Sequence, residues 1–239
     1  MVRAYSRAQE MAEGAGIRSV NTAARSRTWY LVRHGETEWN AVSRMQGQLD
    51  SRLTLLGREH AKRSGRLLAR LGVDAVFASP LGRVRETIAI IAEDVPRPVV
   101  FDDRLKEWSG GAWSGELYAD LEHKWPSEFA AWKADRYHYR SPGGGENFVD
   151  LAIRARAFLG DAAASGDRIA IIAHGFLNRT LAGVLLALSP NDTVRIRQAN
   201  DTVIRIVEGA STASADHFVG GEGPLPGLPG GVTHGQESA

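Results

Sequence analysis

The sequence contains no cysteine among its 239 residues, and this absence excludes several kinds of chemistry. Without a thiol, the chain has no disulfide framework, no thiolate nucleophile and no cysteine-ligated zinc site. The absence leaves the cellular compartment open, because a protein without cysteine tolerates any redox environment.

Long apolar runs and an excess of basic charge are also missing. No segment approaches the ~20 consecutive apolar residues of a membrane helix, and the N-terminus lacks the apolar stretch of a secretory signal. The formal net charge is +1, which provides no basic surface for nucleic acid. We therefore expect a cytoplasmic protein that binds neither membranes nor nucleic acids, in which local arginines must provide any attraction for anions.

The residues that are present fit an ordinary globular domain, with 43% apolar and 24% charged side chains. Strand-like and helix-like segments alternate along the chain, which predicts an α/β fold with helices on both faces of a sheet. We expect a three-layer α/β/α sandwich with a mostly parallel central sheet and a small helical cap insertion. The predicted strands are 29–32, 74–78, 99–101, 168–173, 194–197 and 202–207.

Three predicted helices have clear start signals or apolar stripes. Thr54 can cap a helix with Ala61, Leu68 and Leu71 on its inner face. Ser79-Pro80 provides an N-cap and a first-turn proline for a second helix, and 148–159 has an apolar stripe of period 3.6. The buried positions expected on these two helices are Val84, Ile88, Ile91, Phe148, Leu151, Ala152, Ala155, Phe158 and Leu159.

Composition divides the chain into three parts. We expect a flexible N-terminal extension at 1–27, a catalytic domain at 28–208, and a flexible, Gly/Pro/Ser-rich tail at 209–239. The cap occupies about 108–142 and contains four tryptophans. We interpret these as the core of the cap, and the alternative is that some of them line a substrate pocket.

Polar residues follow three of the predicted strands directly. His34 follows the first strand, Ser79 with Arg83 follows the second, and His174 follows the strand at 168–173. Because ligands bind outside the carboxyl ends of strands in open α/β sheets, these residues can meet at one edge of the sheet.

Five blocks of sequence, in order, resemble one known family. The segment 33–40 (RHGETEWN) is followed by Gln46-Gly47 and Asp50, by 79–83 (SPLGR) with Thr87, by Glu107 with Gly111, and by 144–146 and His174-Gly175 with Arg179. In this order they resemble the histidine phosphatase superfamily, the phosphoglycerate-mutase-like enzymes, over roughly residues 28–207. The junction at 142–146 resembles the broad-specificity phosphatase branch, although Asn147 stands where a serine is commoner.

The resemblance implies a role for each of five catalytic residues. His34 would attack phosphorus and become a phosphohistidine, which splits one hard displacement into two easier ones. Arg33 and Arg83 would hold the phosphoryl oxygens, and His174 would donate to the same oxygens. Glu107 would protonate the leaving oxygen and later deprotonate water.

The predicted substrate-binding residues are Arg33, Asn40, Gln46, Gly47, Arg83, His174 and Gly175. The resemblance implies no metal and no cofactor, because guanidinium groups supply the positive charge that Mg²⁺ supplies in other phosphoryl-transfer enzymes. Two choices stay open on pattern alone, since Arg85 competes with Arg83 and Glu116 competes with Glu107.

The predicted activity is that of a histidine acid phosphatase-like enzyme, a phosphoric monoester hydrolase, and the predicted partner is a small-molecule phosphate ester. The segment between Glu107 and Gly144 is shorter than in the glycolytic mutases of the family, which favours hydrolysis. A mutase and a non-catalytic phospho-ligand or protein-interaction module are the alternatives. A homodimer is compatible with the sequence.

Overall fold

The computed structural model describes residues 26–231, and the predicted N-terminal extension therefore lies almost entirely outside the described residues. A seven-stranded sheet has the order β3-β2-β4-β1-β5-β6-β7. Strands β1 to β4 are parallel to one another, and β5, β6 and β7 continue the sheet in antiparallel fashion. The strands are β1 (Arg27–Arg33), β2 (Ala75–Ala78), β3 (Val99–Phe101), β4 (Arg168–Ala173), β5 (Thr202–Glu208), β6 (Ala213–Val219) and β7 (Glu222–Pro226).

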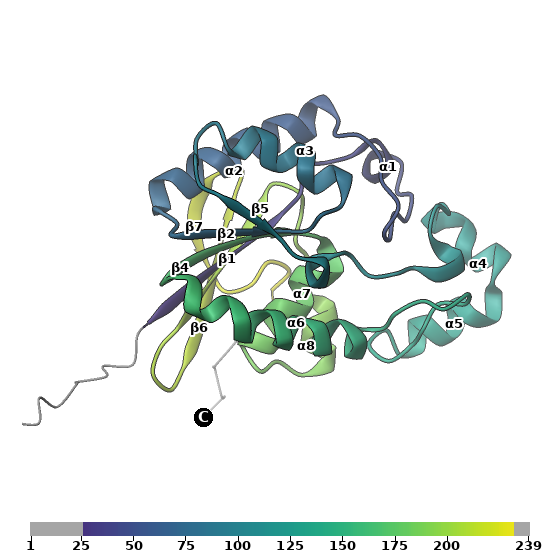
Figure 1. Cartoon of the computed structure of the whole chain (residues 1–239). Coiled ribbons are helices and arrows are strands. Elements are labelled where there is room, and N and C mark those ends of the chain that lie inside the picture. The colour runs from purple at the N-terminus through teal and green to yellow at the C-terminus, as the bar shows by residue number, and fades with distance from the viewer. Residues whose placement is uncertain (1–25, 232–239) are drawn as a thin grey trace, which may run out of the picture.

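Helices cover both faces of this sheet, as Figure 1 shows, and the predicted α/β/α sandwich with a mostly parallel core is confirmed. One face packs against α2 and α3, and the other packs against α6 and α7. The α-helices are α1 (Glu38–Ala41), α2 (Leu55–Leu71), α3 (Gly82–Ile91), α4 (Leu121–Lys124), α5 (Pro126–Ala134), α6 (Phe148–Ala162), α7 (Gly175–Leu185) and α8 (Pro190–Arg195). Within residues 26–231, no helix combines the length and apolar character needed to cross a bilayer.

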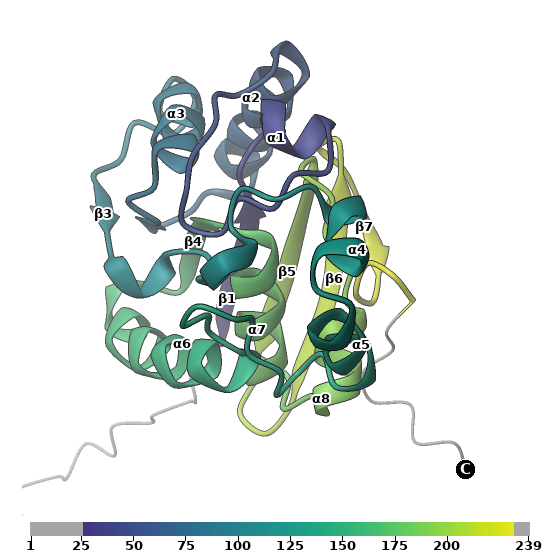
Figure 2. The same cartoon turned by 90° about the vertical axis from the view of Figure 1, so that its right-hand side faces the viewer.

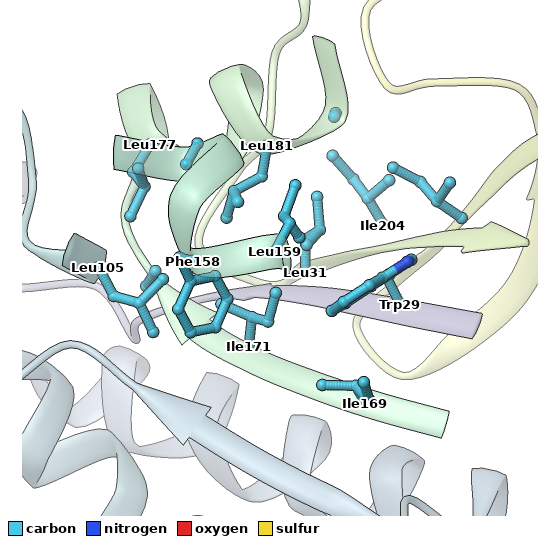
Figure 3. Close-up of a cluster of buried hydrophobic side chains, with 14 of the residues drawn as sticks. Trp29, Leu31, Leu105, Phe158, Leu159, Ile169, Ile171, Leu177, Leu181 and Ile204 are labelled. Carbon is cyan, nitrogen blue, oxygen red and sulfur yellow. The ribbon is translucent and has the colours of Figure 1, made fainter. Parts of the chain in front are cut away.

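Strand β1 shows why one strand contributes to two cores. Successive side chains of a strand point to opposite faces of a sheet. Trp29 and Leu31 accordingly pack with α6 and α7, in the cluster drawn in Figure 3, whereas Tyr30 and Val32 pack with α2 and α3. The strand is buried on both faces, as expected for a parallel strand between two helical layers.

Helix α2 begins where the sequence predicts a start. The Thr54 hydroxyl accepts a hydrogen bond from the Gly57 amide at 2.9 Å, and Gly72 ends the helix with φ = +67°. Ala61 and Leu68 are buried on the predicted inner face. The buried positions predicted on α3 and α6 are also confirmed.

The predicted start of α3 is wrong by two residues. The helix begins at Gly82, and its first amides are bonded by a side chain remote in sequence. The Asp50 carboxylate accepts from the Gly82 amide at 2.8 Å and from the Arg83 amide at 3.2 Å. Ser79 is therefore not an N-cap, and its hydroxyl contacts His174 instead.

The predicted strand at 194–197 is also wrong, because α8 occupies Pro190–Arg195. The Ser189 side chain accepts a hydrogen bond from the Asp192 amide, and Pro190 sits at the first helical position. This start signal outweighs the β-propensity of the Val and Ile residues that follow.

The predicted flexible tail at 209–239 is wrong for the described residues, because β6 and β7 lie within it. All seven residues of β5 pair with β6, so the sheet satisfies the backbone groups of a segment that has few apolar residues. Phe218 and Leu228 are buried and supply the segment's contribution to the core. The domain therefore extends well beyond the predicted boundary at 208, while 232–239 lie outside the described residues.

The predicted helical cap at about 108–142 contains α4 and α5, which lie at one end of the sheet in Figures 1 and 2. Trp108, Trp113 and Trp132 are buried together with Leu121 and Phe129, so the interpretation of these tryptophans as cap core is confirmed. The Trp113 ring contacts both Phe129 and Trp132 edge to face.

Candidate active site

A pocket of about 140 Å³ lies at the carboxyl ends of the central parallel strands. Arg33 is the last residue of β1, and His34 follows it, while His174 follows β4. The structure thus brings together residues that are far apart in sequence, as the strand order predicts. Eight predicted site residues line the pocket: Arg33, His34, Asn40, Gln46, Gly47, Arg83, Glu107 and Gly175.

The imidazole of His34 is held with one nitrogen tied to the backbone and the other facing an arginine. Nδ1 lies 2.8 Å from the Gly35 carbonyl oxygen, so Nδ1 carries the hydrogen and donates it. Nε2 accepts from Arg83 Nε at 3.2 Å. The electron pair of the neutral His34 ring therefore lies on Nε2, the atom that a nucleophilic histidine would use, and in this structure it accepts from Arg83.

Burial keeps this imidazole neutral. His34 is 3% exposed, and burial lowers its pKa well below the ordinary value of 6.5. The nearby guanidinium groups of Arg83 and Arg33 lower the pKa further, because they repel an imidazolium. At neutral pH His34 is a free base.

Gly35 is required for packing against the first turn of α2. A Cβ atom at this position would lie 2.1 Å from the Gly57 carbonyl oxygen, so no larger residue fits. The structure shows here a close approach of two backbone segments. This contact fixes the turn that presents His34 to the pocket.

Arg83 is the fully buried arginine of the site, with 1% exposure. Its Nη1 donates to the Leu49 carbonyl at 2.6 Å and to the Asp50 carboxylate at 2.7 Å, and its Nη2 donates to the Gly47 carbonyl at 2.7 Å. These bonds orient the guanidinium so that Nε faces His34. Burial lowers the pKa of Arg83, and the carboxylates of Glu107 and Asp50 oppose this shift.

His174 is held by Ser79, whose hydroxyl lies 2.7 Å from His174 Nε2. The Leu81 amide donates to the same hydroxyl oxygen at 3.4 Å. Because that oxygen already accepts one hydrogen bond, the geometry favours a hydroxyl hydrogen that points at His174 Nε2. This arrangement places the imidazole hydrogen on Nδ1, a buried atom without a partner among the described residues. The rings of His174 and His34 lie 5.3 Å apart, but His174 is fully buried and is not among the residues that line the pocket.

Arg33 uses one guanidinium nitrogen in a hydrogen bond within the protein and leaves another without a partner among the described residues. Its Nη1 donates to the Gln198 carbonyl at 2.6 Å, whereas its buried Nε has no partner among the described residues. Burial lowers the pKa of Arg33, and the Glu107 carboxylate raises it. A Cβ placed on Gly175 would lie 3.5 Å from the Arg33 guanidinium carbon, which is an ordinary van der Waals contact.

Glu107 is clamped by backbone amides at the start of α7. Its Oε1 accepts from the amides of Trp108 at 3.0 Å and Leu177 at 3.2 Å, and its Oε2 accepts from the Phe176 amide at 3.2 Å. A carboxylate at a helix N-terminus also interacts favourably with the helix dipole. Glu107 is 8% exposed and lines the pocket.

Three predicted substrate-binding residues support the loop between β1 and α2. The Asn40 side-chain oxygen accepts from the Thr37 amide, and Gln46 Nε2 donates to the Thr37 hydroxyl at 2.8 Å. Gly47 adopts φ = +51° and accepts from Arg83 through its carbonyl. In the free protein, Gln46 and Gly47 thus shape the pocket wall through bonds within the chain.

In both choices left open by the sequence, only one of the two residues lines the pocket. Arg85 is exposed and lies 4.1 Å from the centre of the Phe101 ring, whereas Arg83 lines the pocket. Glu116 forms an ion pair with Lys124 at the surface of the cap, whereas Glu107 lines the pocket.

Five pocket-lining residues were not among the predicted site residues: Arg44, Met45, Trp108, Phe176 and Arg179. For Trp108 the alternative left open by the sequence, that a cap tryptophan lines the pocket, is the one the structure shows. Arg179 was noted only as part of the resemblance, although it lies one helical turn after Gly175 and so shares a face of α7 with it. Arg44 lies in a loop, and no periodic pattern points to it. Asn147, the departure from the family pattern, is the N-cap of α6 and accepts from the Asp150 amide at 3.0 Å.

The model of the histidine phosphatase superfamily (branch 1) matches residues 29–217, and the chain belongs to this superfamily. The family membership predicted from the five sequence blocks is thereby confirmed.

Curated relatives include both phosphatases and mutases. A glucosyl-3-phosphoglycerate phosphatase of Mycolicibacterium vanbaalenii is 36% identical over 173 residues, covering 69% of this chain and 76% of the relative. A probable phosphoglycerate mutase GpmB of Erwinia tasmaniensis is 38% identical over 180 residues, covering 74% of this chain and 83% of the relative. The relatives therefore support a phosphatase without assigning a substrate.

Solved structures agree on the fold. A mycobacterial glucosyl-3-phosphoglycerate phosphatase in complex with VO3 superposes with a TM-score of 0.73 at 30% identity, covering 81% of this chain and 98% of the other. The YhfR protein of Bacillus stearothermophilus gives a TM-score of 0.72 at 31% identity, covering 82% of this chain and 97% of the other.

Proposed function

We propose that this chain is a metal-independent phosphomonoesterase of the histidine acid phosphatase type, which hydrolyses small organic phosphates through a phosphohistidine on His34. The observation that carries the proposal is the state of this imidazole. It is buried and neutral, its Nδ1 is tied to a carbonyl, and its Nε2 electron pair lies in a pocket with four arginines and one glutamate.

In the first step, His34 Nε2 attacks phosphorus and the bond from phosphorus to the ester oxygen breaks. Glu107 gives a proton to the leaving oxygen, while Arg83, Arg33 and His174 Nδ1–H stabilise the charge on the three remaining oxygens. Arg83 Nε exchanges its contact with His34 for one of these oxygens.

In the second step, water attacks the phosphohistidine and the bond from phosphorus to nitrogen breaks. Glu107 takes the proton that the water loses, which restores the enzyme to its starting state. The protein's own guanidinium groups supply the positive charge, so the mechanism requires no metal ion.

The alternative is a mutase, which the similarity to a probable phosphoglycerate mutase favours. We favour hydrolysis because the cap is small, with α4 and α5 spanning only 4 and 9 residues. A mutase must keep water from the phosphohistidine, and a small cap encloses less of the pocket. Location in the cytoplasm and a homodimeric state stay predictions.

The test measures phosphate release by the purified protein from p-nitrophenyl phosphate, glycerol phosphate and sugar phosphates in the presence of a chelator. We expect turnover with chelator present, and loss of turnover in His34→Ala with an unchanged circular dichroism spectrum. His123→Ala is the matched control, because this histidine is exposed on α4 and is absent from the pocket lining.

Three outcomes would contradict the proposal in different ways. Loss of activity in chelator with rescue by a divalent ion would overturn the metal-free mechanism. Isomerisation of phosphoglycerate without phosphate release would establish the mutase. Activity of His34→Ala above a few per cent of the parent would exclude His34 as the nucleophile.

A further inference from the structure

Arg154 is an arginine of α6 whose guanidinium hydrogens all have acceptors within the protein. Its Nη1 donates to the carbonyl oxygens of Arg104 at 2.5 Å and Lys106 at 2.6 Å, and its Nη2 donates to the carbonyl oxygen of Glu107 at 3.2 Å. Its Nε and Nη2 also donate to the Glu146 carboxylate, at 3.1 and 3.3 Å. A guanidinium has about five N–H groups to donate, so these bonds use every one of them. Three of the bonds end on the backbone of the short segment that leads to the candidate general acid.

The place of Arg154 on its helix explains why these donors are all used. Leu151 and Phe158 are fully buried, and Arg154 lies on the same face of the helix, with 17% of its side chain exposed. A charged group in such surroundings is costly unless it is paired and hydrogen-bonded. The nearest carbonyls are those at the end of a short 3₁₀ helix, Asp103–Leu105, where carbonyls have no partner inside the helix. Burial therefore explains why the guanidinium needs acceptors, but not why they lead up to Glu107.

Glu146 extends the same set of contacts to the other side of Glu107. Its carboxylate accepts from the Ser109 amide at 2.8 Å, and its own amide donates to the Ser109 carbonyl at 2.9 Å. Its carbonyl oxygen accepts from the indole nitrogen of Trp108. The ion pair between Arg154 and Glu146 joins the two sets of contacts, so the backbone is held both before and after Glu107.

These backbone contacts matter most when Glu107 carries a proton. As a carboxylate, Glu107 accepts from three backbone amides at 3.0, 3.2 and 3.2 Å. A general acid must start protonated, and a neutral carboxyl oxygen is a weaker acceptor than a charged one. In the acid form the bonds at the carboxyl end therefore weaken, and the bonds from Arg154 to the backbone hold the residue in place.

Arg154 takes no direct part in binding the phosphoryl group. It is not among the residues that line the pocket, and its donors are all used within the protein. Its charge does reach one residue of the site, because Arg154 is among the cations that lower the pKa of His174. A test of its role must therefore separate the charge of Arg154 from the geometry of its hydrogen bonds.

We propose that Arg154 is a positioning residue for the general acid. It fixes the backbone of Glu107 so that the protonated carboxyl group faces the leaving oxygen, and Glu146 orients the guanidinium that does this. The proposal rests on the proposed function and adds a residue outside the pocket to the first step of the reaction. A small displacement of a catalytic group can cost about 100-fold in rate, even when its cause lies away from the reacting atoms.

The test is Arg154→Lys, which keeps the positive charge and therefore its effect on His174. A lysine ammonium has fewer donors on a flexible stem and cannot reproduce the planar bonding pattern of a guanidinium. The quantity measured is kcat/KM, because it reports the reaction up to departure of the leaving group, before Glu107 acts on water. For glycerol 3-phosphate we expect a loss of about 10- to 100-fold, and for p-nitrophenyl phosphate a loss below about threefold, since its leaving group needs little proton help.

Two further measurements separate positioning from a general structural role. The inhibition constant of inorganic phosphate should stay within about twofold of the parent value, because Arg33 and Arg83 keep their own contacts with the phosphoryl oxygens. In a Glu107→Gln background, Arg154→Lys should cause no further loss with glycerol 3-phosphate, because the group that it positions can no longer transfer a proton. Arg156→Lys is the matched control, since Arg156 is exposed on the same helix outside the pocket, and it should leave both substrates unaffected.

Glu146→Gln is a second variant, which keeps the test decisive should Arg154→Lys fail to fold. It removes the charge that orients the guanidinium but retains an oxygen that can accept. We expect the same dependence on the leaving group with a smaller loss, about three- to tenfold for glycerol 3-phosphate.

Three results would overturn the proposal. Equal losses for the two substrates would give Arg154 a structural role only, and so would a loss in the Glu107→Gln background as large as that in the parent. Unchanged kcat/KM in Arg154→Lys, or in Glu146→Gln where the lysine variant does not fold, would show that these contacts do not position the acid. Failure of the proposed function is distinguishable, because then the parent protein itself would not hydrolyse p-nitrophenyl phosphate and His34 would not become phosphorylated.

Discussion

The stability of the folded protein should fall steeply as the pH drops below about 6.5, because His34 and His174 are buried in neutral form. They are 3% and 0% exposed, and burial is the largest cause that lowers both pKa values well below 6.5. The charged groups facing them, Arg83 and Arg33, act in the same direction. In the unfolded chain both histidines titrate near 6.5, so below this pH the unfolded chain binds more protons than the folded chain.

The size of the effect follows from the number of protons. Each proton bound only by the unfolded chain changes the free energy of unfolding by 1.36 kcal/mol per pH unit, so two histidines give a limiting slope of about 2.7 kcal/mol per pH unit. Integrated between pH 6.5 and 5.5, where the unfolded histidines are partly protonated, the loss is about 2 kcal/mol. His60, whose pKa is also lowered by burial, adds a smaller loss of the same sign.

The assay is urea unfolding followed by tryptophan fluorescence at pH 7.5, 6.5 and 5.5, in buffers without phosphate, which would bind the pocket and mask the effect. The comparison is with a His34→Gln/His174→Gln double variant, which keeps side chains of similar size but cannot titrate. We expect the parent to lose about 2 kcal/mol more than the double variant between pH 6.5 and 5.5. Equal losses in the two proteins would show that these imidazoles are protonated, or accessible, in the folded state.

Three further variants test individual contacts. Ser79→Ala removes the hydroxyl that orients His174; it should lower kcat about tenfold and cost about 1–3 kcal/mol, because Nε2 loses its buried partner. Ser64→Ala, a buried serine of α2, is its control, and equal kcat in both would refute the orienting role. Glu107→Gln should slow alkyl phosphates far more than p-nitrophenyl phosphate, whose leaving group needs little proton help; equal losses would leave Glu107 with a structural role only. Trp113→Ala should lower the free energy of unfolding by about 3–5 kcal/mol in a urea titration, because this ring is fully buried in the cap, and a loss under about 1 kcal/mol would contradict that packing.

Local patterns predicted the parts of the fold that depend on local chemistry. The Thr54 cap, the apolar stripe at 148–159 and the strand at 168–173 each follow from side chains next to one another in sequence. The start of α3 could not be predicted in this way, because its first amides are bonded by Asp50, about thirty residues upstream. Strand β6 was missed for a related reason, since its hydrogen bonds come from β5 and β7, whereas the Gly/Pro/Ser-rich composition of 209–239 predicted no strand there.

The same distinction applies to the candidate site. Motif order identified the residues that follow strands, including Arg33, His34 and His174, because strand ends converge in this class of fold. It could not identify the hydroxyl of Ser79 as the partner of His174, since 95 residues separate them. Arg44 was also beyond reach, because its place on the pocket wall follows from a loop conformation that has no periodic signature.

The order of strands also constrains how copies of this protein could associate. Within the described residues, β3 and β7 are the outer strands of the sheet. Strand β3 has only three residues, and β7 contains Pro224 and Pro226, which have no amide hydrogen to donate to an incoming strand. Neither edge strand is therefore suited to pairing with a strand of a neighbouring molecule. A dimer would have to form through side chains of the helical layers or the cap.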